Sequence, residues 1–146
     1  MAEHWTDKDS ALLLSALGAT VADAETTKHA LAKGAEEKNP LLGSRPSNTE
    51  INLHGALAAL GITAAATQLP IEQRRVLLGA LTGFKAGLAA QNRHPEKITG
   101  FMDALKKPAL IGALAGLLAH QLPDDGALGV VPTKDKGIAL SLTKRF

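Results

Sequence analysis

The sequence of 146 residues contains no cysteine and no tyrosine, and aromatic side chains make up only 3% of it. Without cysteine the chain forms no disulfide, offers no thiolate nucleophile and builds no cysteine-ligated zinc or iron–sulfur site. A dominant charge is also missing, because the net charge is +2 and Lys and Arg are spread along the chain. No basic block is interleaved with aromatics, so we expect no nucleic-acid partner despite a pI near 9.0.

Catalytic motifs are scarce as well. The paired acids Glu36–Glu37 and Asp124–Asp125 lie in polar connections that are typical of solvated surface. The five histidines show neither i, i+4 spacing nor the H-E-x-x-H pattern of zinc sites. No nucleophile elbow or glycine-rich phosphate loop occurs. The sequence therefore predicts a non-enzymatic protein with no metal and no cofactor.

Alanine, leucine and glycine dominate what is present, arranged in long helical stretches. The chain fits one domain that is large enough for a core. The capping boxes T-D-K-D (residues 6–9) and S-N-T-E (47–50) predict helices that begin near residues 7 and 48. The first polar residues at the N-terminus are acidic, where a secretory signal would be basic, so we expect a mature N-terminus.

The predicted fold is mainly α: a bundle of about four long helices plus a short one, with a small C-terminal β-hairpin. The helices are expected at about 7–33, 48–69, 70–93, 95–106 (the short one) and 108–122, with Pro70 and Pro108 as first helical residues. Two short apolar runs, 128–131 and 138–143, predict the hairpin. We divide the chain into a helical bundle, 1–126, and a C-terminal tail or hairpin, 127–146.

Glycines recur at helical spacing in two of these segments. Gly79, Gly83 and Gly87 share one stripe, and Gly112 and Gly116 repeat the spacing. A glycine inside a helix costs about 1 kcal/mol relative to alanine, so glycines in register indicate a groove for a neighbouring backbone. A core of small side chains also buries little area per residue, which favours a homo-oligomer or a membrane.

The environment of the helices is ambiguous. The segment 48–69 has His54 as its only ionisable group after Glu50 and meets the length of about 20 residues that a membrane span needs. The other helices carry charges such as Asp23 and Lys85, and the mean hydropathy of +0.04 is low for a membrane protein. Both a membrane and an aqueous environment stay open.

The candidate polar site, or structural lock, consists of residues around the first connection: Asp23, Thr27, Glu37, Asn39, Pro40 and His54. A carboxylate at membrane depth often binds a cation or a substrate. In the simpler interpretation, Asp23 accepts hydrogen bonds from backbone amides of the Asn39–Pro40 loop or caps the second helix.

At the other candidate positions, too, a structural role is weighed against a role in binding. Asn39 is expected to form an Asx turn that holds Pro40 rather than to bind a ligand. His54 is expected to be a hydrogen-bonded core histidine rather than a gate or metal ligand. Lys85 is expected to reach solvent or to pair with an acid, Asp23 or Glu25 being the candidates.

At Asp23, Thr27, Glu37, Asn39, Pro40, Gly43, Pro46 and Asn52, with the L-P-x-x-x-R-R link (69–75) and the final Arg-Phe, the chain resembles a group of small uncharacterised bacterial and phage proteins. The resemblance covers about half of the chain, which departs from it in the segment 94–108 and in the extra glycine-rich helix. It implies a small multi-helix membrane protein, and it adds virion and lysis roles to the possibilities. It implies no enzyme activity.

The leading hypothesis is a non-enzymatic oligomeric helical protein that associates with an inner membrane or a virion, as a phage ejection or membrane-modifying component. Its expected partners are copies of itself, membrane lipid, and other virion or structural proteins. One alternative is a soluble, cytoplasmic structural or adaptor protein in which the glycines tighten the bundle. Another is a membrane protein that binds an ion or small molecule through Asp23, Thr27 and His54.

Overall fold

The computed structural model describes residues 4–95, 101–121, 126–132 and 138–144, and this part of the chain is mainly helical. It contains the helices α1 (Asp7–Ala32), α2 (Asn48–Gln68), α3 (Ile71–Gln91) and α4 (Phe101–Gln121). Two strands follow, β1 (Gly126–Pro132) and β2 (Ile138–Lys144). The prediction of a helical bundle is confirmed.

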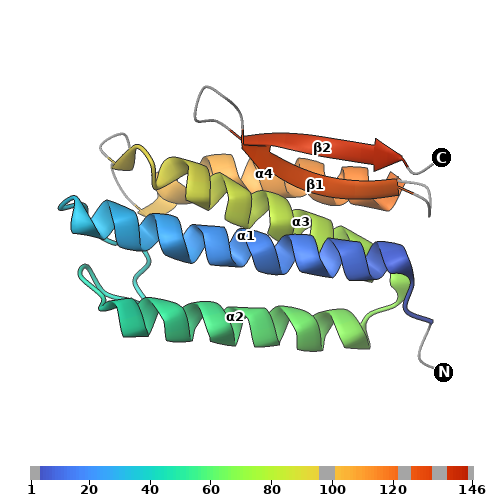
Figure 1. Ribbon diagram of the computed structural model, residues 1–146, viewed down its shortest axis with the longest axis horizontal. Helices are drawn as coiled ribbons and strands as arrows, with labels where there is room; N and C mark the ends of the chain where they lie inside the picture. The colour runs from blue at the N-terminus through green and yellow to red at the C-terminus, as the bar shows by residue number, and fades with distance from the viewer. Residues whose placement is uncertain (1–3, 96–100, 122–125, 133–137, 145–146) are drawn as a thin grey trace.

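Helix α3 is the centre of the arrangement, because it packs on α4 along one side and on α1 along another. Helix α2 lies at the edge, against α1 and to a smaller extent against α3 (Figure 1). The strands are antiparallel, with Gly126 opposite Lys144 and Pro132 opposite Ile138. The two strands lie beside α1 and α3, away from α2 (Figure 1).

Local sequence signals set the helix ends. Both predicted capping boxes are present: Thr6 caps α1 with Asp9, and Ser47 caps α2 with Glu50. The two hydrogen bonds from Ser47 lower the pKa of the exposed Glu50 carboxyl. At the other end of α1, Gly34 has a φ of +90°, and its N–H and that of Ala35 bond to carbonyls of the last turn. A left-handed glycine of this kind is a common helix stop.

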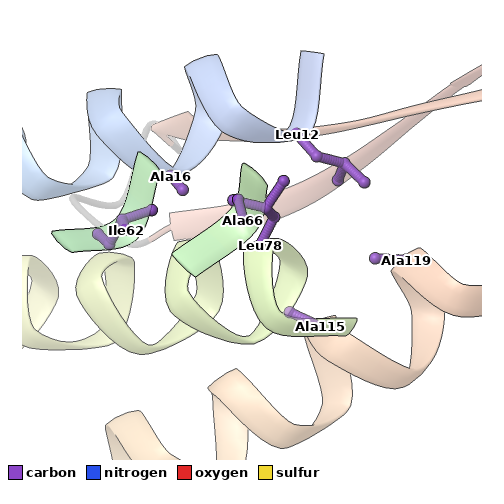
Figure 2. Packing of buried hydrophobic residues seen from close by; sticks show 7 residues of the cluster. All are labelled: Leu12, Ala16, Ile62, Ala66, Leu78, Ala115 and Ala119. Atoms are coloured by element: carbon purple, nitrogen blue, oxygen red, sulfur yellow. The ribbon is translucent and has the colours of Figure 1, made fainter. Parts of the chain in front are cut away.

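The core is built from small aliphatic side chains contributed by all four helices. Figure 2 shows the central cluster, which consists of Leu12, Ala16, Ile62, Ala66, Leu78, Ala115 and Ala119. Four of these seven residues are alanines, so the helix backbones must come close for the cluster to exclude water.

The five predicted helix-packing glycines lie at the contact between α3 and α4. A Cβ atom added at Gly83 would lie 2.7 Å from both the Ala115 Cβ and the Ile111 carbonyl oxygen, and one at Gly112 would lie 2.8 Å from the Ala80 carbonyl oxygen. Cβ atoms essentially never approach other atoms so closely, so glycine is needed here. The neighbouring backbone that the stripe predicted is therefore a second helix of the same chain.

The predicted boundary at Pro108 is wrong. The segments 95–106 and 108–122 were expected to be separate helices, whereas α4 runs continuously from Phe101 and contains Pro108 in its interior. An interior proline costs about 3 kcal/mol, because it removes one hydrogen bond and crowds the preceding turn. Pro108 is fully buried and lies against Gly87 of α3. This tertiary contact offsets the local cost.

The prediction that α2 can cross a membrane is also wrong, and with it the transmembrane interpretation of the chain. Among the helices of the described residues, none is both long enough and apolar enough to span a bilayer. In α2 the leucines and isoleucines are diluted by alanine and threonine, and Asn48, Glu50 and Asn52 occupy its first turns. Runs of small residues made the segment look more apolar than it is.

The glycine contact gives a first prediction. We expect Gly83→Ala to lower the free energy of unfolding by about 1–3 kcal/mol, because the new methyl group forces α3 and α4 apart. The matched control is Gly61→Ala on α2, where an added Cβ meets nothing within 4 Å. This control should be neutral or stabilising by up to about 1 kcal/mol. Urea unfolding of both variants measures the difference, and equal stabilities would contradict the assigned contact.

Candidate functional site

A buried ionic cluster joins three helix ends. Asp9, in the first turn of α1, is completely buried and faces two arginines at the start of α3. The Nη1 atom of Arg74 lies 3.4 Å from Asp9 Oδ2, and Nε of Arg75 donates to Asp9 Oδ1 at 3.2 Å. The Thr6 backbone N–H and hydroxyl donate to the same carboxylate at 2.9 and 2.7 Å. Both oxygens of the buried carboxylate are thus satisfied.

Arg74 also closes the end of α2. Its Nε donates to the Ala66 carbonyl at 2.9 Å and its Nη2 to the Leu69 carbonyl at 3.1 Å. These carbonyls have no partner inside the helix, so the guanidinium serves as a cap. The Cζ atom of Arg74 lies 4.4 Å from the ring centroid of Trp5, which is a cation–π contact.

The environment of Asp9 keeps it ionised. Burial on its own raises the pKa of this carboxyl, but the hydrogen bonds from Thr6 and Arg75, with the positive charge of Arg75, outweigh burial and hold the pKa below its ordinary value. A carboxylate that is fixed in this way, with all its partners inside the protein, is structural. We assign the cluster to holding the helix ends together.

A second polar group lines a cavity of about 330 Å³ between α1, α2 and α3. One wall is formed by the connection between α1 and α2, from Ala35 to Leu42. Five of the six predicted site residues lie on this cavity: Asp23, Thr27, Glu37, Asn39 and His54. Pro40 is exposed and is not among the described lining residues. The structure therefore brings the predicted polar site together.

The simpler interpretation of Asp23, in which it bonds to the loop backbone or caps α2, is wrong in both forms, because Ser47 caps α2. The carboxylate does not bond to the Asn39–Pro40 backbone. It accepts instead from Lys85 Nζ at 2.8 Å and from the Asn92 side-chain amide at 3.2 Å. The loop supplies its own bonds, since Glu37 accepts from the N–H groups of Lys38 and Asn39. Of the alternatives that the sequence left open for Lys85, the structure shows the ion pair with Asp23.

The Asx turn predicted at Asn39 is confirmed, because its side-chain oxygen accepts from the Leu41 N–H at 3.0 Å. Gly43 has a φ of +72°, so the reversal that follows needs a glycine. His54 is half-buried and lies on the cavity wall. The loop thus holds its own shape beside the cavity.

Asn92 and Gln91 are site residues that the sequence analysis missed. The Asn92 amide donates to Thr27 Oγ1 at 2.9 Å as well as to Asp23, and so links α3 to the last turns of α1. Gln91 lies on the cavity wall, and its Oε1 is the only buried side-chain oxygen or nitrogen of the described residues that has no hydrogen-bond partner. One sequence signal could have found Asn92: it lies two helical turns after Lys85, so both side chains are on the same face of the helix.

Large apolar side chains are exposed on all four helices, and on α2 and α4 three exposed leucines recur at helical spacing. On α2, Leu53, Leu57 and Leu60 are 59%, 59% and 68% exposed, and we call them the α2 leucine face. On α4, Leu110, Leu114 and Leu117 are similarly exposed and form the α4 leucine face. Contiguous exposed leucines of this kind commonly mark an interaction surface.

Comparisons of the chain with protein-family models, with curated proteins and with solved structures found no match. Within the described residues, no group of three or more histidines and acids is placed to hold a metal ion. The function must therefore be argued from the cavity, the ionic cluster and the exposed faces.

The ionic cluster gives a second prediction. We expect Asp9→Asn to lower the free energy of unfolding at pH 7 by about 3 kcal/mol or more, because Arg74 is left buried without its counter-charge. The control Asp7→Asn removes an exposed acid from the same helical turn. It should cost less than about 1 kcal/mol.

The pH dependence of stability checks the same assignment. Because the pKa of Asp9 is lowered in the folded protein, its contribution is fully present above the ordinary value of 3.8 and is lost as the pH falls through the lowered pKa. Urea unfolding between pH 5 and 2 should therefore show a steeper acid loss in the wild type than in Asp9→Asn. Parallel curves would contradict the assignment.

Proposed function

We propose that this chain is a non-enzymatic structural protein, a helical subunit that assembles with copies of itself through the α2 and α4 leucine faces. The observation that carries the proposal is the exposure of three leucines on each of these two helices. The structural alternative is favoured over a membrane-spanning role, because none of the helices of the described residues can span a bilayer.

The glycine stripes also support this alternative. In a membrane oligomer they would be available to a second subunit, but here they are occupied by the α3–α4 contact. Self-association must therefore use other surfaces. On α2 and on α4 three exposed leucines recur at helical spacing, whereas α1 exposes one leucine, Leu14, and one valine, Val21.

The α2 leucine face suits contact with a protein. From Ile51 to Ile71 the chain has no Asp, Glu, Lys or Arg, so burying this face requires no charge to lose its water. The helix buries only three of its 21 residues within the subunit, Ile51, Ile62 and Ala66. A helix with so little inward burial gains more from a partner than a central helix does.

The positions of the two faces allow each subunit to bind two neighbours. Helices α2 and α4 lie at different edges of the bundle, with α1 and α3 between them (Figure 1). If the α2 face of one copy binds the α4 face of the next, the contact repeats into a ring or a filament. If each face binds its own kind, two-fold dimers form instead.

The C-terminal tail and the setting of the assembly also belong to this proposal. The tail 127–146 is proposed to be a C-terminal hairpin attached to the bundle, and its strands could extend a neighbour's sheet. The resemblance to phage proteins suggests a virion as one setting for such an assembly, with the cytoplasm as the alternative.

The oligomer gives a third prediction. We expect light scattering after size-exclusion chromatography to show a wild-type mass of several subunits. Leu57→Lys should weaken the association by about tenfold or more, because a leucine buried at the contact contributes about 1.5–3 kcal/mol. The control Leu41→Lys changes a residue of the α1–α2 connection that lies on neither face and is the most exposed large hydrophobic side chain among those that the structure describes. It should leave the mass unchanged.

A wild-type protein that stays monomeric at high concentration would contradict self-assembly. It would favour an adaptor that presents the same faces to a different protein. Circular dichroism of each variant verifies that a change in mass does not come from unfolding.

A further inference from the structure

The cavity between α1, α2 and α3 is separate from the leucine faces, and the proposed assembly gives it no role. Its volume of about 330 Å³ lies within the range of sites for small organic ligands. Half-buried apolar side chains, Phe84 and Leu88 among them, form one side of it. The polar groups on Asp23, Thr27, Lys85 and Asn92 lie on the same wall region of α1 and α3.

Most polar atoms of the cavity satisfy one another. Asp23 is bonded to Lys85 and Asn92, and Asn92 is bonded to Thr27. These bonds fix the side chains before any ligand arrives, which lowers the entropy cost of binding. The wall of the cavity is therefore fixed before a ligand binds, and it has both polar and apolar parts.

Gln91 is the exception. Its Oε1 atom is buried and accepts no hydrogen bond from the described residues. A buried acceptor without a partner costs free energy, so native proteins normally supply it with a donor from the protein, a water molecule or a ligand. A ligand with an N–H group would complete it.

The charged residues of the wall indicate which charge the ligand should carry. The described lining residues include three carboxylates and two ammonium groups: Asp23, Glu36, Glu37, Lys38 and Lys85. The carboxylates of this wall outnumber its ammonium groups by one. A cationic head group is therefore favoured over an anionic one.

We propose that this cavity binds a small amphipathic amine, whose apolar body packs against Phe84 and Leu88 and whose N–H donors face Gln91 Oε1 and the carboxylates. The proposed binding is non-covalent, and no bond is made or broken. The amine would bind away from the leucine faces through which the subunits are proposed to assemble.

The probe is phenethylamine, with hydrocinnamate as a matched acid that has a similar phenyl body and the opposite charge. The full-length, nitrogen-15-labelled protein is titrated with each, and the side-chain amide signals of Gln91 and Asn92 are followed by NMR. We expect phenethylamine to shift both signals saturably, with a Kd of about millimolar for so small a ligand. Hydrocinnamate should bind at least about tenfold more weakly.

Two variants place the amine in the cavity. Gly55 lines it, and a Cβ added there meets only the Ala24 Cβ, at 3.8 Å. Gly55→Leu should fill the space and abolish binding without disturbing the fold. Gly61→Leu makes the same change on the same helix where an added Cβ meets nothing within 4 Å, and it should bind as the wild type does.

Gln91→Met removes the acceptor and keeps the length of the side chain. It should weaken phenethylamine binding by about tenfold, because one buried hydrogen bond is lost. If Gly55→Leu does not fold, Gln91→Met still tests whether the amine binds in the cavity. The proposal is overturned if phenethylamine produces no saturable shift, if hydrocinnamate binds as tightly, or if both cavity variants bind as the wild type does.

Discussion

The buried Asp9 carboxylate is the constraint on which the placement of α2 depends. Helix α2 has few buried residues of its own, so apolar burial does little to fix its position. Arg74 compensates for this at one end, because it contacts Asp9 of α1 and donates to the Ala66 and Leu69 carbonyls. One guanidinium thus ties the end of α2 to the starts of α1 and α3. The position of α2 also sets the cavity, because Ile51, His54 and Gly55 of this helix form part of its wall.

The features that the sequence predicted are local ones. The two capping boxes depend on residues three positions apart, and they placed the starts of α1 and α2 correctly. The polar site was also predictable in part, because Asp23, Thr27 and the α1–α2 connection are close in sequence. His54 follows on the next helix, which the short connection returns alongside α1.

Apart from the pairing of Lys85 with Asp23, which was one of two candidates, the long-range partners could not be predicted from the sequence. Asp9 and its arginines are 65 and 66 residues apart, and Asp23 and Asn92 are 69 apart. Only the packing of α3 against α1 decides that they meet. Pro108 illustrates the same limit, since its local cost argued for a helix boundary and only its contact with Gly87 shows why the helix continues. The glycine stripe predicted a close backbone, but helical spacing does not say whether that backbone belongs to the same chain.

The proposed assembly and the proposed ligand act on opposite sides of one helix. The inner side of α2 contributes Ile51, His54 and Gly55 to the cavity wall, and its outer side carries the leucine face. A neighbour bound outside and an amine bound inside would each restrict the same sparsely packed element. Two ligands that both favour one position of α2 necessarily strengthen each other's binding by the same factor. The weak inward packing of α2 adds little to the stability of a lone subunit. It would, however, couple binding at the cavity to binding at the leucine face.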